Sequence, residues 1–237
     1  IDQLPDSLKS DHNISNLLSV IGILLSLICN NNDYRIAINE LFAKNPDQWF
    51  AQVDALKLFD DLVQELEQYL HSLIGFKGLP YRCELVSNYN NIAVYNDSKA
   101  TNLDACITAI KSVKKLSLGK IWLILGGVTK EDLDDAASRK LFRESFDQKI
   151  AGVVIFGKDQ ISKHKLFELL PPGVDSVILN SVDGVTGIED VVNAVYERAC
   201  PNDTILFSPA AASFDLFNNY MHRGALFTEA VLKHAQL

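Results

Sequence analysis

The stretch Tyr95-Asn96-Asp97-Ser98-Lys99-Ala100-Thr101-Asn102 joins two segments of different periodicity. An alternating run with Ile92 and Val94 precedes it, and an apolar run with helical spacing follows it. The stretch is therefore predicted to be a strand-to-helix turn, with Thr101 or Asn102 as the helix cap. Such a turn collects free backbone N–H groups at the positive end of a helix dipole, which favours an anionic ligand. An ordinary capped polar loop is the alternative interpretation.

Around this turn, short apolar strands alternate with helices. Strands are expected at 82–87, 91–96, 121–125, 153–156, 174–179 and 204–207, and helices at 102–115, 133–148, 159–170, 187–199 and 213–234. Asn90-Asn91, between the first two strands, predicts a hairpin. Fully apolar strands that alternate with helices indicate a parallel sheet covered on both faces. The expected fold is a doubly wound, mainly parallel, Rossmann-like α/β domain with a leading hairpin, over residues 77–237.

Residues 1–76 show no strand pattern and are expected to form a helical segment. The predicted helices cover 12–29, 34–43 and 48–74, and apolar residues in the last recur at three- and four-residue spacing. Because the sequence begins with Ile1, already inside apparent structure, we expect it to be a piece of a longer protein.

Composition narrows the class of protein. Apolar residues make up 48% and charged residues 22% of the 237 residues, as in a globular protein. The net charge of −8 disfavours a general nucleic-acid or anionic-membrane binder. The longest apolar stretch, 17–29, is too short to cross a bilayer, so we expect a cytoplasmic location and no membrane partner.

Four cysteines are spaced far apart, without a CxxC pair: Cys29, Cys83, Cys106 and Cys200. Each lies in or beside an apolar stretch, so they are expected to be buried free thiols in a reducing compartment. A zinc site is not expected.

Polar motifs follow three of the predicted strands. Asp97, Lys99 and Thr101 follow one strand, Gly126-Gly127 and Lys130 follow another, and the segment 208–213 follows the last. In open parallel sheets, ligands bind beyond the carboxyl ends of the strands. Taken singly, turn glycines and a solvated lysine are the commoner interpretations. Their coincidence at one edge indicates a site for a small anionic molecule.

Two familiar nucleotide motifs are not found in the sequence. No GxGxxG string follows a strand, which disfavours a dinucleotide oxidoreductase, and no GxxxxGK[ST] string provides a P-loop. The histidines form no metal or triad pattern that would support a hydrolase.

The motifs together resemble the D-glutamate-adding branch of the Mur ligase family. They are, in that family's order, Leu79-Pro80-Tyr81-Arg82, Asn96–Asn102, Leu125-Gly126-Gly127 with Lys130, and Ser208–Phe217 with Arg223-Gly224. The helix containing His12-Asn13 and Asn16 resembles the last part of the family's central ATPase domain. The resemblance covers 8–30 and 77–237, and residues 31–57 look like an insertion.

The resemblance implies an ATP-dependent, amide-forming ligase of peptidoglycan synthesis. ATP would phosphorylate the carboxylate of UDP-N-acetylmuramoyl-L-alanine, and the amine of D-glutamate would attack the acyl phosphate. The implied nucleotide contacts are Asn13 and Asn16 at adenine, Arg82 at phosphate and Asp97 at ribose, with Lys99 as the catalytic cation. The implied D-glutamate contacts are Thr101, Lys130, Ser213 and the backbone of Phe214, with the ring of Tyr220 closing the pocket.

Some positions depart from the family pattern. Tyr81 stands where the family often has histidine, Val128-Thr129 replaces an acidic, glycine-rich turn, and Tyr220 replaces phenylalanine. The resemblance places the ligands for Mg²⁺ and the rest of the ATP site in the remainder of the ligase chain. We therefore expect these 237 residues alone to be inactive. A non-catalytic α/β module that binds a small dicarboxylate or nucleotide, and another small-molecule enzyme such as a nucleotide-sugar transferase, are the alternatives.

Overall fold

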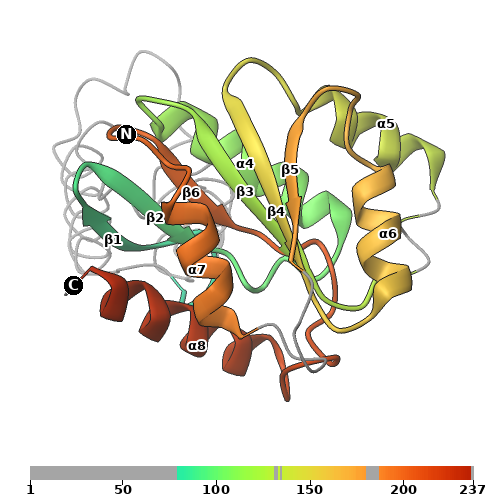
Figure 1. Ribbon diagram of the computed structural model, residues 1–237. Coiled ribbons are helices and arrows are strands. Elements are labelled where there is room, and N and C mark those ends of the chain that lie inside the picture. The colour runs from blue at the N-terminus through green and yellow to red at the C-terminus, as the bar shows by residue number, and fades with distance from the viewer. Residues whose placement is uncertain (1–78, 131–132, 134, 180–186, 236–237) are drawn as a thin grey trace, which may run out of the picture. The chain divides into compact units, whose positions relative to one another are not determined.

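The computed structural model describes residues 79–130, 133, 135–179 and 187–235, which lie within one compact unit, Gly78–Leu237 (Figure 1). Six strands form one sheet: β1 (Glu84–Tyr89), β2 (Ile92–Asn96), β3 (Ile121–Gly126), β4 (Ile150–Phe156), β5 (Asp175–Ile178) and β6 (Thr204–Phe207). The helices are α4 (Leu103–Leu116), α5 (Ala136–Glu144), α6 (Gln160–Glu168), α7 (Ile188–Tyr196) and α8 (Tyr220–His234). This alternation of strands and helices confirms the predicted α/β fold.

The sheet order is β1-β2-β6-β3-β4-β5, and all neighbours are parallel except the β1–β2 pair. The last strand, β6, therefore lies between β2 and β3. Phe207 at the end of β6 pairs with Asn96 of β2 on one side and Ile124 of β3 on the other. The segments that leave these three strands consequently start at one edge of the sheet, where ligands bind in folds of this kind.

The leading hairpin confirms the sequence prediction. Asn90 and Asn91 have φ angles of 53° and 60°, the left-handed conformation that a two-residue hairpin turn requires. β1 begins at Glu84 rather than residue 82, because Cys83 also has a left-handed φ, 48°, and cannot continue an extended strand.

Helices cover both faces of the sheet. Side chains of β3 alternate between two cores, since Leu123 and Leu125 pack with α4, α5 and α6, while Trp122 and Ile124 pack with α7 and α8. In Figure 1, α7 and α8 cross the near side of the sheet. Each fully buried large apolar side chain contributes about 1.5–3 kcal/mol, so the two cores hold the strand ends in fixed positions.

Two helix predictions are wrong in their bounds. The last helix starts at Tyr220 and not at 213, because Asn219 is extended and its side chain accepts the N–H of His222. Likewise α5 spans only Ala136–Glu144, with Asp135 as its cap. The expected helices at 12–29, 34–43 and 48–74, the insertion, Asn13, Asn16 and Cys29 lie outside the described residues.

The cysteine prediction is partly wrong. Cys106 is buried and Cys83 half-buried, whereas Cys200 is exposed because it lies in the turn after α7. All three are free thiols. Within the described part of the chain, no helix has the length and apolar character needed to cross a membrane.

Candidate functional site

The turn after β2 is held from within the domain by Asn96. This fully buried residue donates from Nδ2 to the Gly224 carbonyl (2.8 Å) and to Thr228 Oγ1 (3.0 Å), both in α8. Its Oδ1 accepts the N–H of Ser98 (3.1 Å). The start of the motif is therefore tied to a helix more than a hundred residues away in sequence.

The N-cap of the helix after this turn, α4, is one of the two predicted residues. Asn102 is extended, and its side chain accepts the N–H of Ala105 (2.9 Å) at the start of α4. Thr101, half-buried, is the residue before the cap, so Asn102 and not Thr101 is the N-cap of α4.

Asp97 is buried, with 6% of its surface exposed. Its Oδ1 accepts the N–H of Cys83 (3.1 Å), and its Oδ2 accepts the hydroxyl of Ser208 (2.8 Å). Burial raises the pKa of Asp97 to about 7, although these bonds and the charges of Arg82 and Arg223 act in the opposite direction. Asp97 therefore changes charge near neutral pH.

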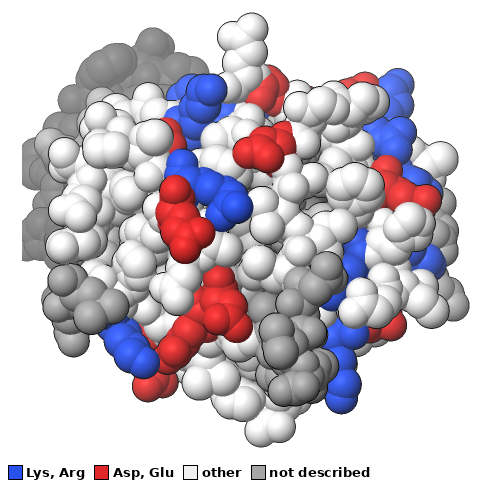
Figure 2. Space-filling model, in the orientation of Figure 1, with Lys and Arg blue, Asp and Glu red and all other residues white. Residues whose placement is uncertain are grey.

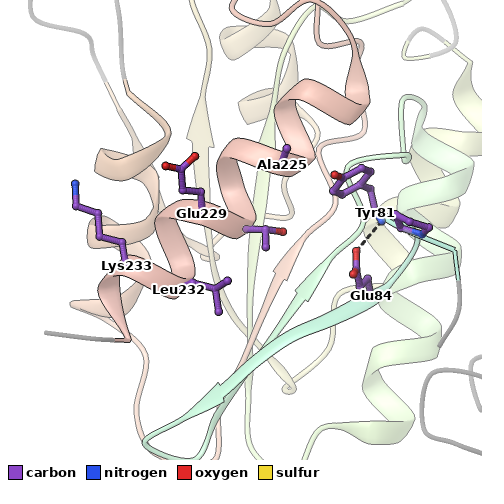
Figure 3. Close-up of a pocket in the computed structure, with 8 residues that line it drawn as sticks. Tyr81, Glu84, Ala225, Glu229, Leu232 and Lys233 are labelled. Atoms are coloured by element: carbon purple, nitrogen blue, oxygen red, sulfur yellow. Dashed lines mark hydrogen bonds between the residues drawn. The ribbon is translucent and has the colours of Figure 1, made fainter.

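Arg82 lies in a tight turn with an unusual backbone. The residues on either side of it, Tyr81 and Cys83, have φ angles of 61° and 48°. The Tyr81 N–H donates to Glu84 Oε2 (2.8 Å), the dashed line in Figure 3. Left-handed residues other than glycine cost about 1–3 kcal/mol each and are concentrated at functional sites. Against burial, which raises the pKa of Asp97, the charge of Arg82 in this turn acts to lower it.

Lys99 and Tyr220 meet at the surface. The Lys99 ammonium lies 4.1 Å from the centre of the Tyr220 ring, within the range of a cation–π contact. The Lys99 N–H donates to the Tyr81 carbonyl (3.0 Å), which anchors its main chain to the Arg82 turn. The fold thus places Lys99, predicted beside the phosphates, next to Tyr220, predicted at the D-glutamate pocket.

The ends of β3 and β6 are joined by a short bridge. Val128 and Ala212 exchange two N–H···O bonds of 2.8 and 2.9 Å. Gly127 precedes the bridge with a φ of +119°, and a Cβ there would lie 2.1 Å from the Ala212 carbonyl oxygen. Only glycine allows the two strand ends to approach this closely.

Arg223, in the first turn of α8, connects all three strand ends. It is fully buried and donates to Ser98 Oγ (3.0 Å), the Ser98 carbonyl (2.8 Å), the Gly126 carbonyl (3.2 Å) and the Ala211 carbonyl (2.9 Å). Burial lowers the pKa of Arg223 to about 10, so the side chain remains charged at neutral pH. One guanidinium therefore links the segments that carry Lys99, Lys130 and Ser213.

Lys130 is exposed beyond the end of β3. The preceding residue, Thr129, is held by Ser162 of α6, which accepts the Thr129 N–H (3.0 Å) and lies 3.1 Å from its hydroxyl. Ser162 in turn donates to Asp159, the cap of α6. Thr129, a departure from the family pattern, is thus a structural anchor for the chain next to Lys130.

Ser213 and Phe214 follow the bridge from β6. Ser213 is buried (2% exposed), and its carbonyl accepts the N–H of Phe217 (2.9 Å). Phe214 is 74% exposed, so its ring is available to solvent rather than packed in the domain.

Three residues with evident roles at this edge had no function assigned from the sequence: Ser98, Ser208 and Arg223. Ser98 and Ser208 are short polar residues inside motifs, and their partners lie far away in sequence. Arg223 offered a clearer signal, because a charged residue stands among the apolar positions that α8 buries. Among the described residues, no group of three His, Cys, Asp or Glu side chains could hold a metal ion.

A groove of about 680 Å³ lies between the Arg82 turn, β1 and α8 (Figure 3). Its lining residues are Pro80, Tyr81, Glu84, Ala225, Thr228, Glu229, Leu232 and Lys233. The lining mixes acidic, basic and apolar side chains, which favours no single class of ligand. The face of the molecule in Figure 2 likewise carries acidic and basic side chains next to one another.

Comparison with known proteins identifies the relatives of this domain. Residues 81–211 match the family described as "Mur ligase, glutamate ligase domain". The UDP-N-acetylmuramoylalanine–D-glutamate ligase of Hydrogenobaculum sp. is 36% identical over 169 residues, 71% of this chain and 36% of that protein. The ligase of the same name from Hahella chejuensis is 32% identical over 197 residues, 83% of this chain and 41% of that protein. The chain therefore spans well under half the length of these curated relatives.

Proposed function

This chain belongs to the Mur ligase family through its glutamate ligase domain, and we propose that it is the amino-acid-presenting part of an ATP-dependent ligase that adds D-glutamate to UDP-N-acetylmuramoyl-L-alanine. The reaction would serve peptidoglycan synthesis in the cytoplasm. The observation that carries the proposal is the junction of three strand ends, where Arg223 binds the segments after β2, β3 and β6 at one edge.

The proposed reaction has two steps. The terminal phosphoryl group of ATP passes to the alanyl carboxylate, which gives an acyl phosphate and ADP. The amine of D-glutamate then attacks the acyl carbon, an amide bond forms, phosphate leaves and the ammonium proton is released. This chemistry depends on positioning and charge stabilisation more than on a protein nucleophile.

On the nucleotide side, Asp97 is the proposed ribose ligand and Arg82 the proposed phosphate ligand. A carboxylate accepts hydroxyl protons, and a guanidinium pairs with phosphate oxygens, so each residue type suits its partner. Lys99 would supply positive charge beside the phosphates and the anion that forms during attack. Asn13 and Asn16 are the proposed adenine contacts, and they lie outside the described residues.

On the amino-acid side, cations and hydroxyls suit a dicarboxylate. Lys130 and the hydroxyls of Thr101 and Ser213 are the proposed ligands, together with the backbone of Phe214 and the ring of Tyr220. They come from the segments after β2, β3 and β6, which supports a shared pocket. Mg²⁺ would neutralise phosphate charge when bound, and the family resemblance assigns its ligands to the remainder of the ligase.

Two substitutions in the complete ligase test this division. Losing a charge-assisted contact costs about 1.5–3 kcal/mol, so Lys130→Ala is expected to raise KM for D-glutamate about ten- to a hundredfold. Asp97→Ala is expected to weaken the binding of ATP and to leave KM for D-glutamate nearly unchanged. Lys111→Ala, an exposed lysine of α4, is the matched control and should change neither.

The opposite pattern would contradict the proposal. If Lys130→Ala affected ATP and D-glutamate equally, Lys130 would not belong to the amino-acid pocket. If Asp97→Ala left nucleotide affinity unchanged, its role would be only the structural one that its bonds to Cys83 and Ser208 describe.

A further inference from the structure

Ser98 lies between two residues of the proposed site and is itself fully buried. Its hydroxyl donates to the Tyr220 carbonyl (2.8 Å) and accepts from Arg223 Nε (3.0 Å). Its carbonyl accepts from Arg223 Nη2 (2.8 Å). Three hydrogen bonds therefore join this residue to the first turn of α8.

The residue that Ser98 holds in place is the one that contacts the Lys99 ammonium. Tyr220 is the first residue of α8, and its ring centre lies 4.1 Å from Lys99 Nζ. The backbone of Lys99 is fixed separately, through its N–H bond to the Tyr81 carbonyl (3.0 Å). The Lys99 ammonium thus contacts a ring that belongs to the first residue of α8.

Removing the Ser98 hydroxyl, as in Ser98→Ala, would break two hydrogen bonds. Arg223 is fully buried, and a buried donor left without a partner is costly. Without the hydroxyl, Arg223 Nε loses its acceptor and the Tyr220 carbonyl loses one of its donors. The first turn of α8 would then be held to the β2 end by fewer contacts.

We propose that Ser98 is a positioning residue that holds α8 so that the Tyr220 ring fixes the Lys99 ammonium over the proposed site. The positioning of Tyr220 and Lys99 does not depend on the proposed function, and only its effect on catalysis rests on that function. Because the ammonium would act on charge that develops during the reaction, a change in its position is expected to alter kcat more than substrate affinity.

The geometric half of the proposal is tested by NMR on the 237-residue chain with ¹³C-methylated lysines, with the Lys99 signal identified through Lys99→Arg. A cation beside a ring gives methyl signals displaced by the ring current. The displacement is expected to persist in Tyr220→Phe, to vanish in Tyr220→Leu and to fall strongly in Ser98→Ala. An undiminished displacement in either of the last two variants would overturn the proposal.

Ser112→Ala is the matched control for Ser98→Ala. Ser112 is a serine of α4 with 2% exposure, and its hydroxyl has no hydrogen-bond partner within the described part of the chain. It is therefore equally buried but connects nothing. The displaced Lys99 signal and the kinetic constants are expected to stay unchanged in this variant.

The catalytic half is tested in the complete ligase. Lys99 is exposed, and a cation–π contact at an exposed site corresponds to about a two- to fivefold effect. Ser98→Ala and Tyr220→Leu are therefore expected to lower kcat by that factor, with KM for ATP changed less than about twofold. A lost NMR displacement with unchanged kcat would support the positioning but overturn the role of Lys99 in the proposed function. A reduced kcat with the displacement intact would overturn the positioning. If Ser98→Ala does not fold, Ser98→Cys provides both measurements with the same expected direction, because a thiol is a weaker donor and acceptor than the hydroxyl that joins Tyr220 and Arg223.

Discussion

A carboxyl group that is 6% exposed, such as that of Asp97, loses most of its hydration when the domain folds. Burial raises the pKa of Asp97 from 3.8 to about 7, so the folded state keeps a proton that the unfolded state releases between these values. The free energy of unfolding is therefore expected to fall as pH rises from about 4 to 7 and to be level above 7.

Asp97→Asn should remove this pH dependence. The amide can accept from Cys83 and donate to the Ser208 hydroxyl, and it has no charge to bury. At pH 8 the variant is expected to be more stable than the wild type by at most about 4 kcal/mol, and at pH 4 the two should be similar. Urea unfolding at several pH values measures this. A wild-type slope that persists in the variant would assign the pH dependence to another group.

Single residues also show what could be predicted from the sequence. The cap Asn102 was predicted as one of two candidates, because cap chemistry is local and the neighbouring residues indicate it. The ligand roles of Asp97 and Lys99 came from the family resemblance and stay predictions. The roles of Ser208 and Arg223 were not predicted, because their partners at Asp97 and Ser98 are 111 and 125 residues away. Local patterns do not contain such distant pairs.

Among the elements, the ends of β3 and β6 depend on one glycine. At Gly127, alanine would be strained by the φ of +119° and would also place its Cβ 2.1 Å from the Ala212 carbonyl oxygen. Gly127→Ala is therefore expected to destabilise the domain by more than the 1–2 kcal/mol that a left-handed residue costs, and to raise KM for D-glutamate in the complete ligase.

Gly173→Ala separates crowding from backbone strain. Gly173 has a φ of +85°, but a Cβ there would meet nothing within 4 Å. Urea unfolding of both variants is the measurement, and Gly173→Ala should show only the strain cost of about 1–2 kcal/mol. If both variants lost the same free energy of unfolding, the close contact between Gly127 and Ala212 would tolerate a side chain.

Strands were easier to predict than helix ends. The hairpin strands were expected from their alternation around Asn90-Asn91, and the later strands from short apolar runs bounded by turn residues. The start of α8 was misplaced because residues 213–219 carry apolar side chains at helical spacing. The helix nevertheless begins only at Tyr220, because Asn219 is its N-cap and accepts the N–H of His222. The place of β6 between β2 and β3 follows from tertiary packing, so sequence order alone does not reveal it.

At the level of the whole molecule, we expect the domain to supply a binding edge rather than a phosphate-transfer device. Moving a phosphoryl group from ATP requires the phosphate chain to be aligned with the acceptor and its charge neutralised, commonly by a glycine-rich loop and Mg²⁺. The 237 residues contain no GxxxxGK[ST] string. Arg82 and Lys99 can add charge at the edge, but two cations without a phosphate-binding loop do not hold a γ-phosphate in line with a carboxylate.

This chain alone is therefore expected to fold and to be catalytically silent. Its α/β domain has two cores of its own, so a cooperative thermal transition should be observed. Alignment of reactants accounts for roughly 7–11 kcal/mol of a barrier, so its loss should lower the rate by many orders of magnitude. The measurement is phosphate release with UDP-N-acetylmuramoyl-L-alanine, ATP, Mg²⁺ and D-glutamate present, with the complete ligase assayed in parallel. Turnover by the purified chain above the level of a Lys99→Ala, Lys130→Ala double variant prepared in the same way would show that these residues suffice, and would refute the division of labour proposed for the ligase.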